Sequence, residues 1–176
     1  HNGCPQQFSF CNQNRITGEN HQPQPEEVAA LLQSAAKQMK ERVQNAEIAF
    51  FGGSFTAIDP DYRLALLKTA HAACETYGFA GIRCSTRPDA IDDERLTVLK
   101  QYGVTAIELG AQSMDGEVLL LNRRGHTAKD VENAARLIRA YGFELGLQMM
   151  TGLPGDSDAK AMKTVKRLLA LKPNTM

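Results

Sequence analysis

Three copies of a short triplet, each a tyrosine, a glycine and a hydrophobic residue, divide this chain into strand–helix units. They are Tyr77-Gly78-Phe79, Tyr102-Gly103-Val104 and Tyr141-Gly142-Phe143. In each copy an amphipathic stretch precedes the triplet and a short apolar run follows it. Glycine readily adopts the left-handed conformation that ends helices. We therefore predict that each triplet ends a helix and returns the chain to a sheet. The spacing of the copies is unequal, so they mark recurring βα units.

The hydrophobic pattern predicts alternating strands and helices along the chain. The predicted strands are 47–51, 81–85, 104–109 and 144–150, and the predicted helices are 25–43, 59–78, 92–102, 116–121, 127–142 and 157–171. Repeated alternation implies a parallel sheet with right-handed crossovers. A closed eight-unit barrel needs about 250 residues, so 176 residues fit an α/β fold with a parallel-stranded partial (β/α) barrel.

The two ends of the sequence indicate part of a larger domain. The chain begins at His1 instead of a methionine and stops at Met176, soon after the last predicted helix. Four strands are visible, and a fifth is expected just before His1. We therefore expect residues 1–176 to be one core domain from which the first strand and the last βα units are missing.

Composition narrows the class of protein. Twenty Lys and Arg residues balance twenty Asp and Glu residues, which argues against a broad surface for polyanions and leaves room only for a local basic patch. No apolar run approaches the roughly 20 residues that a membrane span needs, and no signal peptide is visible. Four cysteines without a disulfide framework indicate a reducing compartment. We expect a cytoplasmic protein without a membrane partner.

Residues suited to ligand binding follow the predicted strands. In parallel α/β folds the ligand lies at the carboxyl ends of the strands. The loops expected there are 3–5 onward, 52–56, 85–89, 110–113 and 151–156, and all are polar or contain glycine or proline. A single loop of this kind needs such residues for its turn alone. Five in succession favour a ligand site.

The first loop resembles the cluster loop of radical S-adenosylmethionine enzymes. In that family a Cys-x3-Cys-x2-Cys motif ligates three irons of a 4Fe-4S cluster, and an aromatic residue precedes the last cysteine. Cys4, Phe10 and Cys11 match these positions, whereas Phe8 stands where the middle cysteine is expected. The resemblance implies that Cys4 and Cys11 are metal ligands and that Phe10 contacts the cofactor.

The resemblance extends over nearly all of the chain. Gly52-Gly53-Ser54 is similar to the family's glycine-rich motif, whose backbone holds the methionine amine of the cofactor. The segments 108–113, 122–127 and 148–156 look like the branch that contains the elongator catalytic subunit and oxygen-independent coproporphyrinogen oxidase. In that branch, residues at the positions of Gln112, Arg124 and Gln148 contact the ribose or carboxylate of the cofactor. The combination of motifs, in order, is more specific than the glycines alone.

This resemblance implies an enzyme. The 4Fe-4S cluster and S-adenosylmethionine would together generate a 5′-deoxyadenosyl radical that abstracts hydrogen from a substrate, with thiolates holding the cluster at low potential and the barrel excluding water. An external one-electron donor is required. The substrate would be tRNA or a small metabolite, and the sequence names neither the catalytic residues nor the oligomeric state.

Phe8 leaves three interpretations open because its side chain has no lone pair for iron. In the first, the sequence has been changed at this position. In the second, the chain is a family member without a cluster. In the third, another thiolate takes the place of the missing cysteine as an iron ligand. Cys84, at a strand end, is the candidate substitute, although a small buried hydrophobe is its usual role. Cys4 and Cys11 with His1 and His21 also suggest zinc, but the cysteine spacing is longer than in a zinc knuckle.

The rival function is a non-catalytic α/β domain that binds an adenosyl ligand or a protein partner. Restoring cysteine at position 8 should matter only to the enzyme. Two further alternatives concern the loop after the short helix. Arg123 and Arg124 would form a solvated surface pair if they held no ligand. His126 lies near the predicted cofactor face, but the sequence does not favour a substrate contact for it.

Overall fold

The computed structural model describes residues 21–176, so the sequence-predicted residues His1, Cys4, Phe8, Phe10 and Cys11 lie outside the described part. The elements are helices α2 (Pro25–Met39), α3 (Pro60–Tyr77), α4 (Asp93–Gln101), α5 (Gly116–Leu121), α6 (Ala128–Ala140) and α7 (Asp158–Ala170), and strands β1 (Glu47–Phe50), β2 (Gly81–Thr86), β3 (Val104–Gln112) and β4 (Glu144–Met149). Short 3₁₀ helices span Lys40–Asn45, Phe55–Ala57 and Pro88–Ala90. No helix within residues 21–176 has the length and apolarity to cross a membrane.

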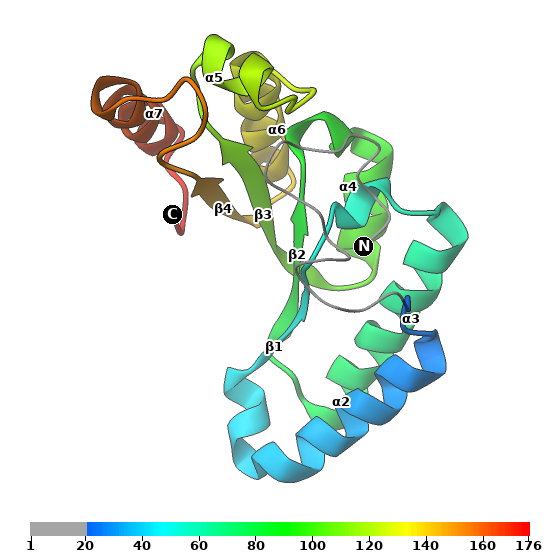
Figure 1. Cartoon of the computed structure of the whole chain (residues 1–176). Helices are drawn as coiled ribbons and strands as arrows, with labels where there is room; N and C mark the ends of the chain where they lie inside the picture. Colours follow the sequence, from blue (N-terminus) through cyan, green and yellow to red (C-terminus); the bar gives the residue numbers. More distant parts are fainter. Residues whose placement is uncertain (1–20) are drawn as a thin grey trace.

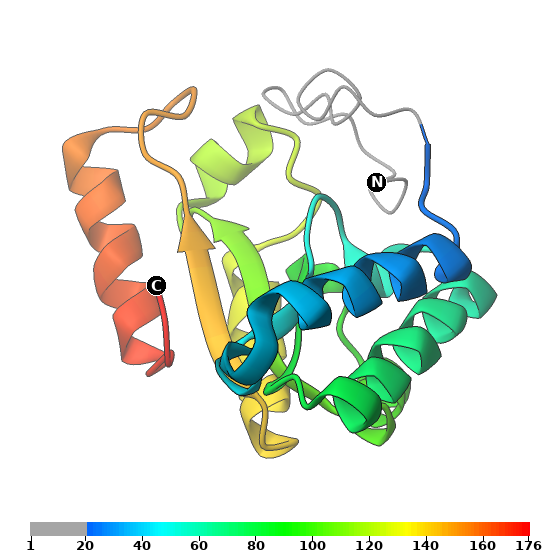
Figure 2. The same ribbon diagram turned by 90° about the horizontal axis from the view of Figure 1, so that it is seen from below.

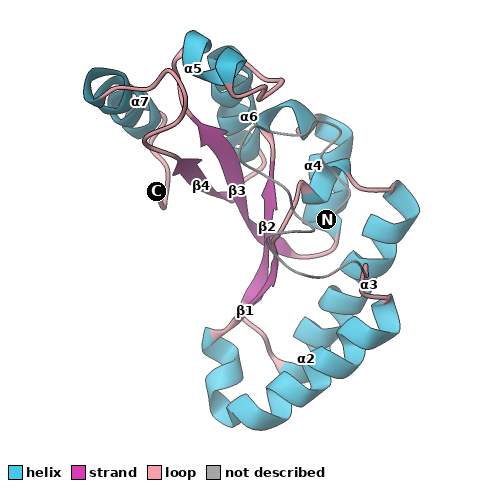
Figure 3. Ribbon diagram, viewed as in Figure 1, coloured by secondary structure: helices cyan, strands magenta, loops and turns pink. Residues whose placement is uncertain are grey.

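The four strands form one sheet in the order β1-β2-β3-β4, and every neighbouring pair is parallel. Helices alternate with the strands along the chain (Figures 1 and 3). After α7 the chain returns to the free edge of β4, where Thr175 forms a parallel bridge with Gly146. The predicted α/β fold with a parallel, partial-barrel sheet is confirmed.

The triplets and the caps set the ends of the helices as the sequence predicts. Gly78, Gly103 and Gly142 have φ angles of 80°, 75° and 76°, in the left-handed region where a side chain would be strained. At the start of α6, Thr127 accepts a hydrogen bond from the Asp130 amide, and the Asp130 carboxylate accepts one from the Thr127 amide. This reciprocal pair is a capping box, with Asp in the place of the usual Glu or Gln.

One face of the sheet forms the core with the helices. Ile82, Ile107 and Leu145, from three neighbouring strands, are completely buried there. Cys84 belongs to the same cluster, and burial raises the pKa of its thiol to about 12. A free cysteine in an apolar core behaves as a small hydrophobic residue. Complete burial of Cys84 in this cluster gives it a packing role and offers no support for the hypothesis that it substitutes as a cluster ligand.

The other face carries charge near the amino ends of the strands. Arg83 on β2 donates to Glu47 on β1 at 2.9 Å and to Glu108 on β3 at 2.8 Å, and lies 3.5 Å from Glu144 on β4. Gly146 makes this arrangement possible, because a Cβ there would lie 2.0 Å from a carboxylate oxygen of Glu108. The cluster ties all four strands together across the sheet.

Most predicted boundaries agree with the structure to within two residues, and two differ by more. The helix predicted for residues 25–43 ends as α helix at Met39 and continues as the 3₁₀ helix. The strand predicted for residues 104–109 extends to Gln112, since Gly110 and Gln112 still pair with β4. Ala111 is left out of this register, which makes it a bulge. The extension matters because it places Gln112 on a strand end and not in a loop.

Candidate functional site

The candidate site lies at the edge of the sheet to which the strands point. In Figure 2, α5 and the loop that precedes α7 lie beyond the ends of β3 and β4. Four of the five predicted ligand loops follow β1, β2, β3 and β4, which are all parallel, so they open at this edge. The fifth, around Cys4, lies outside the described residues.

The end of β3 has an unusual backbone. Gly110 pairs with Gln148 of β4 and Gln112 pairs with Met149, which leaves Ala111 as the extra residue. Gln112 has a φ of 62°, a left-handed conformation that a non-glycine residue adopts only where its surroundings hold it. The Gln112 carbonyl accepts a hydrogen bond of 2.9 Å from the Met150 amide. Strand β3 therefore turns sharply at the residue that the sequence assigns to cofactor binding.

The loop between α5 and α6 supports this turn. Its residues alternate, with Asn122, Arg124 and His126 buried and Arg123 exposed. The Arg124 Nη2 donates to the Gly110 carbonyl at 3.0 Å. His126 Nε2 lies 3.1 Å from the Ala111 carbonyl. Arg123 and Arg124 are thus not a solvated pair, because Arg124 points into the protein.

Two predicted cofactor-binding side chains meet above Gly110. A Cβ built on Gly110 would lie 3.1 Å from Gln112 Nε2 and 3.6 Å from Arg124 Nη2. Gln148 is the register partner of Gly110, so its side chain lies on the same face of the sheet as this position. The structure therefore brings three of the sequence-predicted residues to the adjoining ends of β3 and β4.

The glycine-rich segment after β1 lies further along the same edge. The ends of β1 and β3 are separated by β2, so Gly52 and Gly53 do not adjoin the Gly110 position. Gly52 has a φ of 97°, which only glycine adopts readily. The Ser54 hydroxyl is buried, accepts from the Arg87 amide at 3.1 Å and lies 2.9 Å from the Thr86 hydroxyl. Ser54 thus fastens the loop to β2, and its hydroxyl points to this internal contact.

A charged pair between these two regions was missed by the sequence analysis. The buried Arg87 makes two hydrogen bonds of 2.6 Å to the Asp89 carboxylate just after β2. The pKa of His126 is lowered chiefly by burial and further by the charges of Arg124 and Arg87, while Asp89 opposes the shift. The sequence predicts that the loop 85–89 lies at the carboxyl ends of the strands, but it does not single out Arg87 or Asp89 within that loop.

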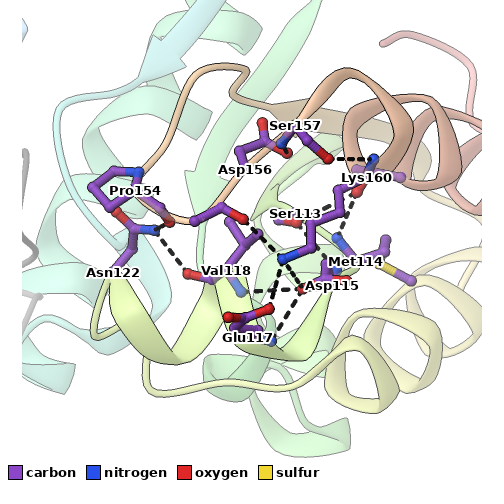
Figure 4. Close-up of polar contacts among 12 residues, drawn as sticks. Ser113, Met114, Asp115, Glu117, Val118, Asn122, Pro154, Asp156, Ser157 and Lys160 are labelled. Carbon is purple, nitrogen blue, oxygen red and sulfur yellow. Dashed lines mark hydrogen bonds and ion pairs between the residues drawn. The ribbon is translucent and has the colours of Figure 1, made fainter.

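A second missed feature joins the loops after β3 and β4 (Figure 4). Lys160 on α7 donates to Glu117 at 2.7 Å and to the Gly155 carbonyl at 2.8 Å, and lies 3.6 Å from Asp115. Its hydrogen bond to Glu117 raises the pKa of Lys160. The Asn122 amide group adds a bond of 3.0 Å to the Pro154 carbonyl. Most of these partners are more than 30 residues apart in the sequence, so a local sequence pattern could not predict their contacts.

Comparison with known proteins identifies the family. The family model of the Radical SAM superfamily matches residues 1–168. The chain belongs to the radical SAM superfamily. Its members are enzymes, and the cofactors of the superfamily are a 4Fe-4S cluster and S-adenosylmethionine.

Relatives lie in the branch that the motifs indicate. A tRNA uridine(34) acetyltransferase from Dehalococcoides mccartyi is 26% identical over 89% of this chain and 41% of the relative. The archaeal Elp3 of Methanocaldococcus infernus matches with a TM-score of 0.67 and 23% identity, over 84% of this chain and 40% of that one. Coproporphyrinogen III oxidase from Escherichia coli matches with a TM-score of 0.66 and 20% identity, over 97% and 40%. The radical SAM chain thus spans less than half of these relatives, and the structural matches establish the fold.

The described residues of this radical SAM chain fit one of the two cofactors. The Gln112 amide and the Arg124 guanidinium, both donors, border the space left by the missing Cβ of Gly110, which suits the ribose and carboxylate oxygens of S-adenosylmethionine. For the cluster, residues 21–176 contain no group of three His, Cys, Asp or Glu side chains that could hold a metal. Its sequence-predicted ligands Cys4 and Cys11 lie outside that range, and His21 pairs with Glu27 at 3.0 Å.

Proposed function

We propose that this chain is the part of a radical SAM enzyme that binds S-adenosylmethionine, and that the whole enzyme acts on tRNA. One observation carries the cofactor assignment: the Gln112 amide and the Arg124 guanidinium meet above Gly110 at the carboxyl end of β3. This is the edge where ligands bind in parallel α/β folds. The membership in the superfamily supplies the identity of the ligand.

Each predicted residue has a distinct task in this proposal. Arg124 pairs with the carboxylate of the cofactor, because a guanidinium offers a planar pair of donors. Gln112 and Gln148, on adjoining strand ends, bind ribose hydroxyls through their amides. The backbone of Gly52 and Gly53 accepts the methionine amine, which needs a close approach that side chains would block. Ser54 holds that loop in place through Thr86 and the Arg87 amide.

The cluster belongs to the segment around Cys4 and Cys11. When bound with S-adenosylmethionine it supplies the hydrogen-abstraction chemistry of the superfamily. Two cysteines and Phe8 provide one thiolate fewer than the family motif. We propose that Cys4 and Cys11 are ligands and that Phe8 limits cluster assembly.

The substrate class rests on the sequence relatives. The relative from Dehalococcoides mccartyi is a tRNA uridine(34) acetyltransferase, and human Elongator complex protein 3 is 30% identical over 67% of this chain. The chain itself has a formal net charge of zero. Binding of the tRNA phosphate backbone needs Lys and Arg side chains. It would therefore rely on a local basic patch of this chain or on other parts of the enzyme.

Anaerobic reconstitution tests the proposed chemistry. The Phe8→Cys form should bind about four irons per chain, show the brown absorbance of a 4Fe-4S cluster, and release 5′-deoxyadenosine when reduced with S-adenosylmethionine. The unaltered chain should assemble less cluster. Absence of both cluster and product in the Phe8→Cys form would refute the proposal. Full activity in the unaltered chain would show instead that Phe8 is no obstacle.

The tRNA proposal has its own test. Total tRNA added to the reconstituted protein should raise the yield of 5′-deoxyadenosine, because this product forms when the 5′-deoxyadenosyl radical abstracts hydrogen from a bound substrate. Digested nucleosides from the same tRNA serve as the control for a small-molecule substrate. Stimulation by the nucleosides but not by intact tRNA would favour a small metabolite.

A further inference from the structure

At the bulge near the end of β3, two consecutive carbonyl groups accept hydrogen bonds from side chains of the loop after α5. The Gly110 carbonyl accepts from Arg124 and the Ala111 carbonyl accepts from His126, at 3.0 and 3.1 Å. Both side chains are 5% exposed. We call these two contacts the β3 staple. The two carbonyl groups belong to the residues directly before Gln112, whose left-handed backbone needs support from its surroundings.

The chemistry of the Ala111 contact defines the state of the histidine. A carbonyl oxygen only accepts, so Nε2 carries the proton and Nδ1 carries the lone pair. Nδ1 is buried and has no hydrogen-bond partner in the structure of residues 21–176. The charged groups near the ring are Arg124 on its own loop, Asp130 on α6, and Arg87 and Asp89 from the loop after β2. Burial is the main cause that lowers the pKa of His126, the charges of Arg124 and Arg87 add to it, and the hydrogen bond to Ala111 and the Asp89 carboxylate oppose it. The net lowering favours the neutral ring that the contact with the Ala111 carbonyl implies.

We propose that His126 is a positioning residue for cofactor binding: its Nε2–H bond to the Ala111 carbonyl fixes the bulge and thereby aims the Gln112 amide at the ligand. Without this bond the Ala111 carbonyl would keep only the hydrogen bond of 2.8 Å from the Ser113 amide within the turn, and the bond from the Met150 amide would remain on Gln112. The turn would then lose its buried contact with the loop after α5, which limits the positions that the Gln112 side chain can take. The part that concerns the ligand rests on the proposed function. The part that concerns the bulge rests on the structure alone.

Two substitutions of similar size separate the two ring nitrogens. In His126→Gln the amide nitrogen falls where Nε2 lies, so the donor to Ala111 is kept. In His126→Asn the amide reaches only the position of Nδ1, so that donor is lost. His71→Gln, on α3 and half-exposed, is the control for removal of a histidine.

Binding of S-adenosylhomocysteine, measured by calorimetry on the 176-residue chain, is the first readout. His126→Asn should weaken binding about tenfold, whereas His126→Gln and His71→Gln should stay within about twofold of the unaltered chain. In a Gln112→Ala background, His126→Asn should cost no more than about twofold, because its effect passes through Gln112. Equal losses for Asn and Gln, or additive losses in the double variant, would overturn the proposal.

Hydrogen exchange without ligand is the second readout. His126→Asn should speed amide exchange over residues 109–114, and His126→Gln should not. If the unaltered chain fails to bind S-adenosylhomocysteine, the proposed function fails while this exchange pattern still decides the bulge. If His126→Asn fails to fold, nitrogen NMR of the unaltered chain decides: a proton on Nδ1 instead of Nε2 would refute the staple.

Discussion

Two arrangements hold the loops around the candidate site, and they differ in kind. The β3 staple consists of Arg124 and His126, buried side chains that bind main-chain carbonyl oxygens. The second, which we call the Lys160 clamp, joins Lys160 to Glu117 and to the Gly155 carbonyl on the protein surface (Figure 4). Glu117 keeps 68% of its side chain exposed, so water and salt compete for this pair.

The difference indicates how the site divides its tasks. Buried hydrogen bonds to the backbone fix atoms within narrow limits, because the alternative is an unsatisfied polar group in the interior. Exposed ion pairs contribute little and tolerate movement. We therefore expect the staple to determine ligand affinity and the clamp to limit the motion of the surrounding loops. Four predictions test this comparison.

The largest effect is expected from Arg124→Met. The variant removes both the cationic partner for the ligand carboxylate and the donor to Gly110. Affinity for S-adenosylhomocysteine, measured by calorimetry, should fall about 100-fold, since charge-assisted bonds contribute about 1.5–3 kcal/mol each. Arg123→Met is the matched control, because its side chain is adjacent in sequence and exposed. Equal losses in the two variants would mean that net charge, and not the buried position, governs binding.

A smaller effect is expected from Gly110→Ala. The new Cβ would lie 3.1 Å from Gln112 Nε2, so the amide must move by a few tenths of an ångström while the backbone of β3 stays in place. Affinity for the same ligand should fall about tenfold with little change in the free energy of unfolding. In Gly116→Ala the Cβ meets nothing within 4 Å, and binding should be unchanged. Unaltered affinity in Gly110→Ala would show that the ligand does not use this space.

The sequence predicts the elements of this fold better than it predicts the contacts that hold the site. The triplets and the capping box at Thr127 are local signals, and helix ends depend on local backbone conformation. The end of β3 was misplaced because pairing with β4 extends the strand to Gln112, and a partner strand is not visible in a local pattern. The contact between Lys160 and Glu117 joins residues that are far apart in the sequence and depends on tertiary position. Arg87 and Asp89 are only two residues apart, but the sequence does not show that their side chains pair. The roles of Cys4 and Cys11 as metal ligands remain predictions, because both residues lie outside the described part of the chain.

A pH dependence separates the staple from the rest of the protein. The folded state holds the pKa of His126 below its ordinary value of 6.5, so below that pH the unfolded chain binds more protons than the folded one. His126 therefore makes the free energy of unfolding fall as pH drops through and below 6.5. Urea unfolding should show this decline in the unaltered chain and a shallower one in His126→Gln. A steeper decline in the variant would contradict a neutral, buried ring.

The smallest effect is expected from Lys160→Met, which removes the centre of the clamp. Its pairs with Glu117 and Asp115 are exposed to solvent, so the free energy of unfolding should change little. The loss should shrink further at about 1 M salt, where charges are screened beyond about 3 Å. Lys163→Met, exposed on the same helix, controls for the loss of one positive charge from α7. Ligand affinity should stay within about twofold. If Lys160→Met weakened binding as much as Arg124→Met, the loops after β3 and β4 would have to act as one unit, and the distinction between a positioning staple and a loose clamp would fail.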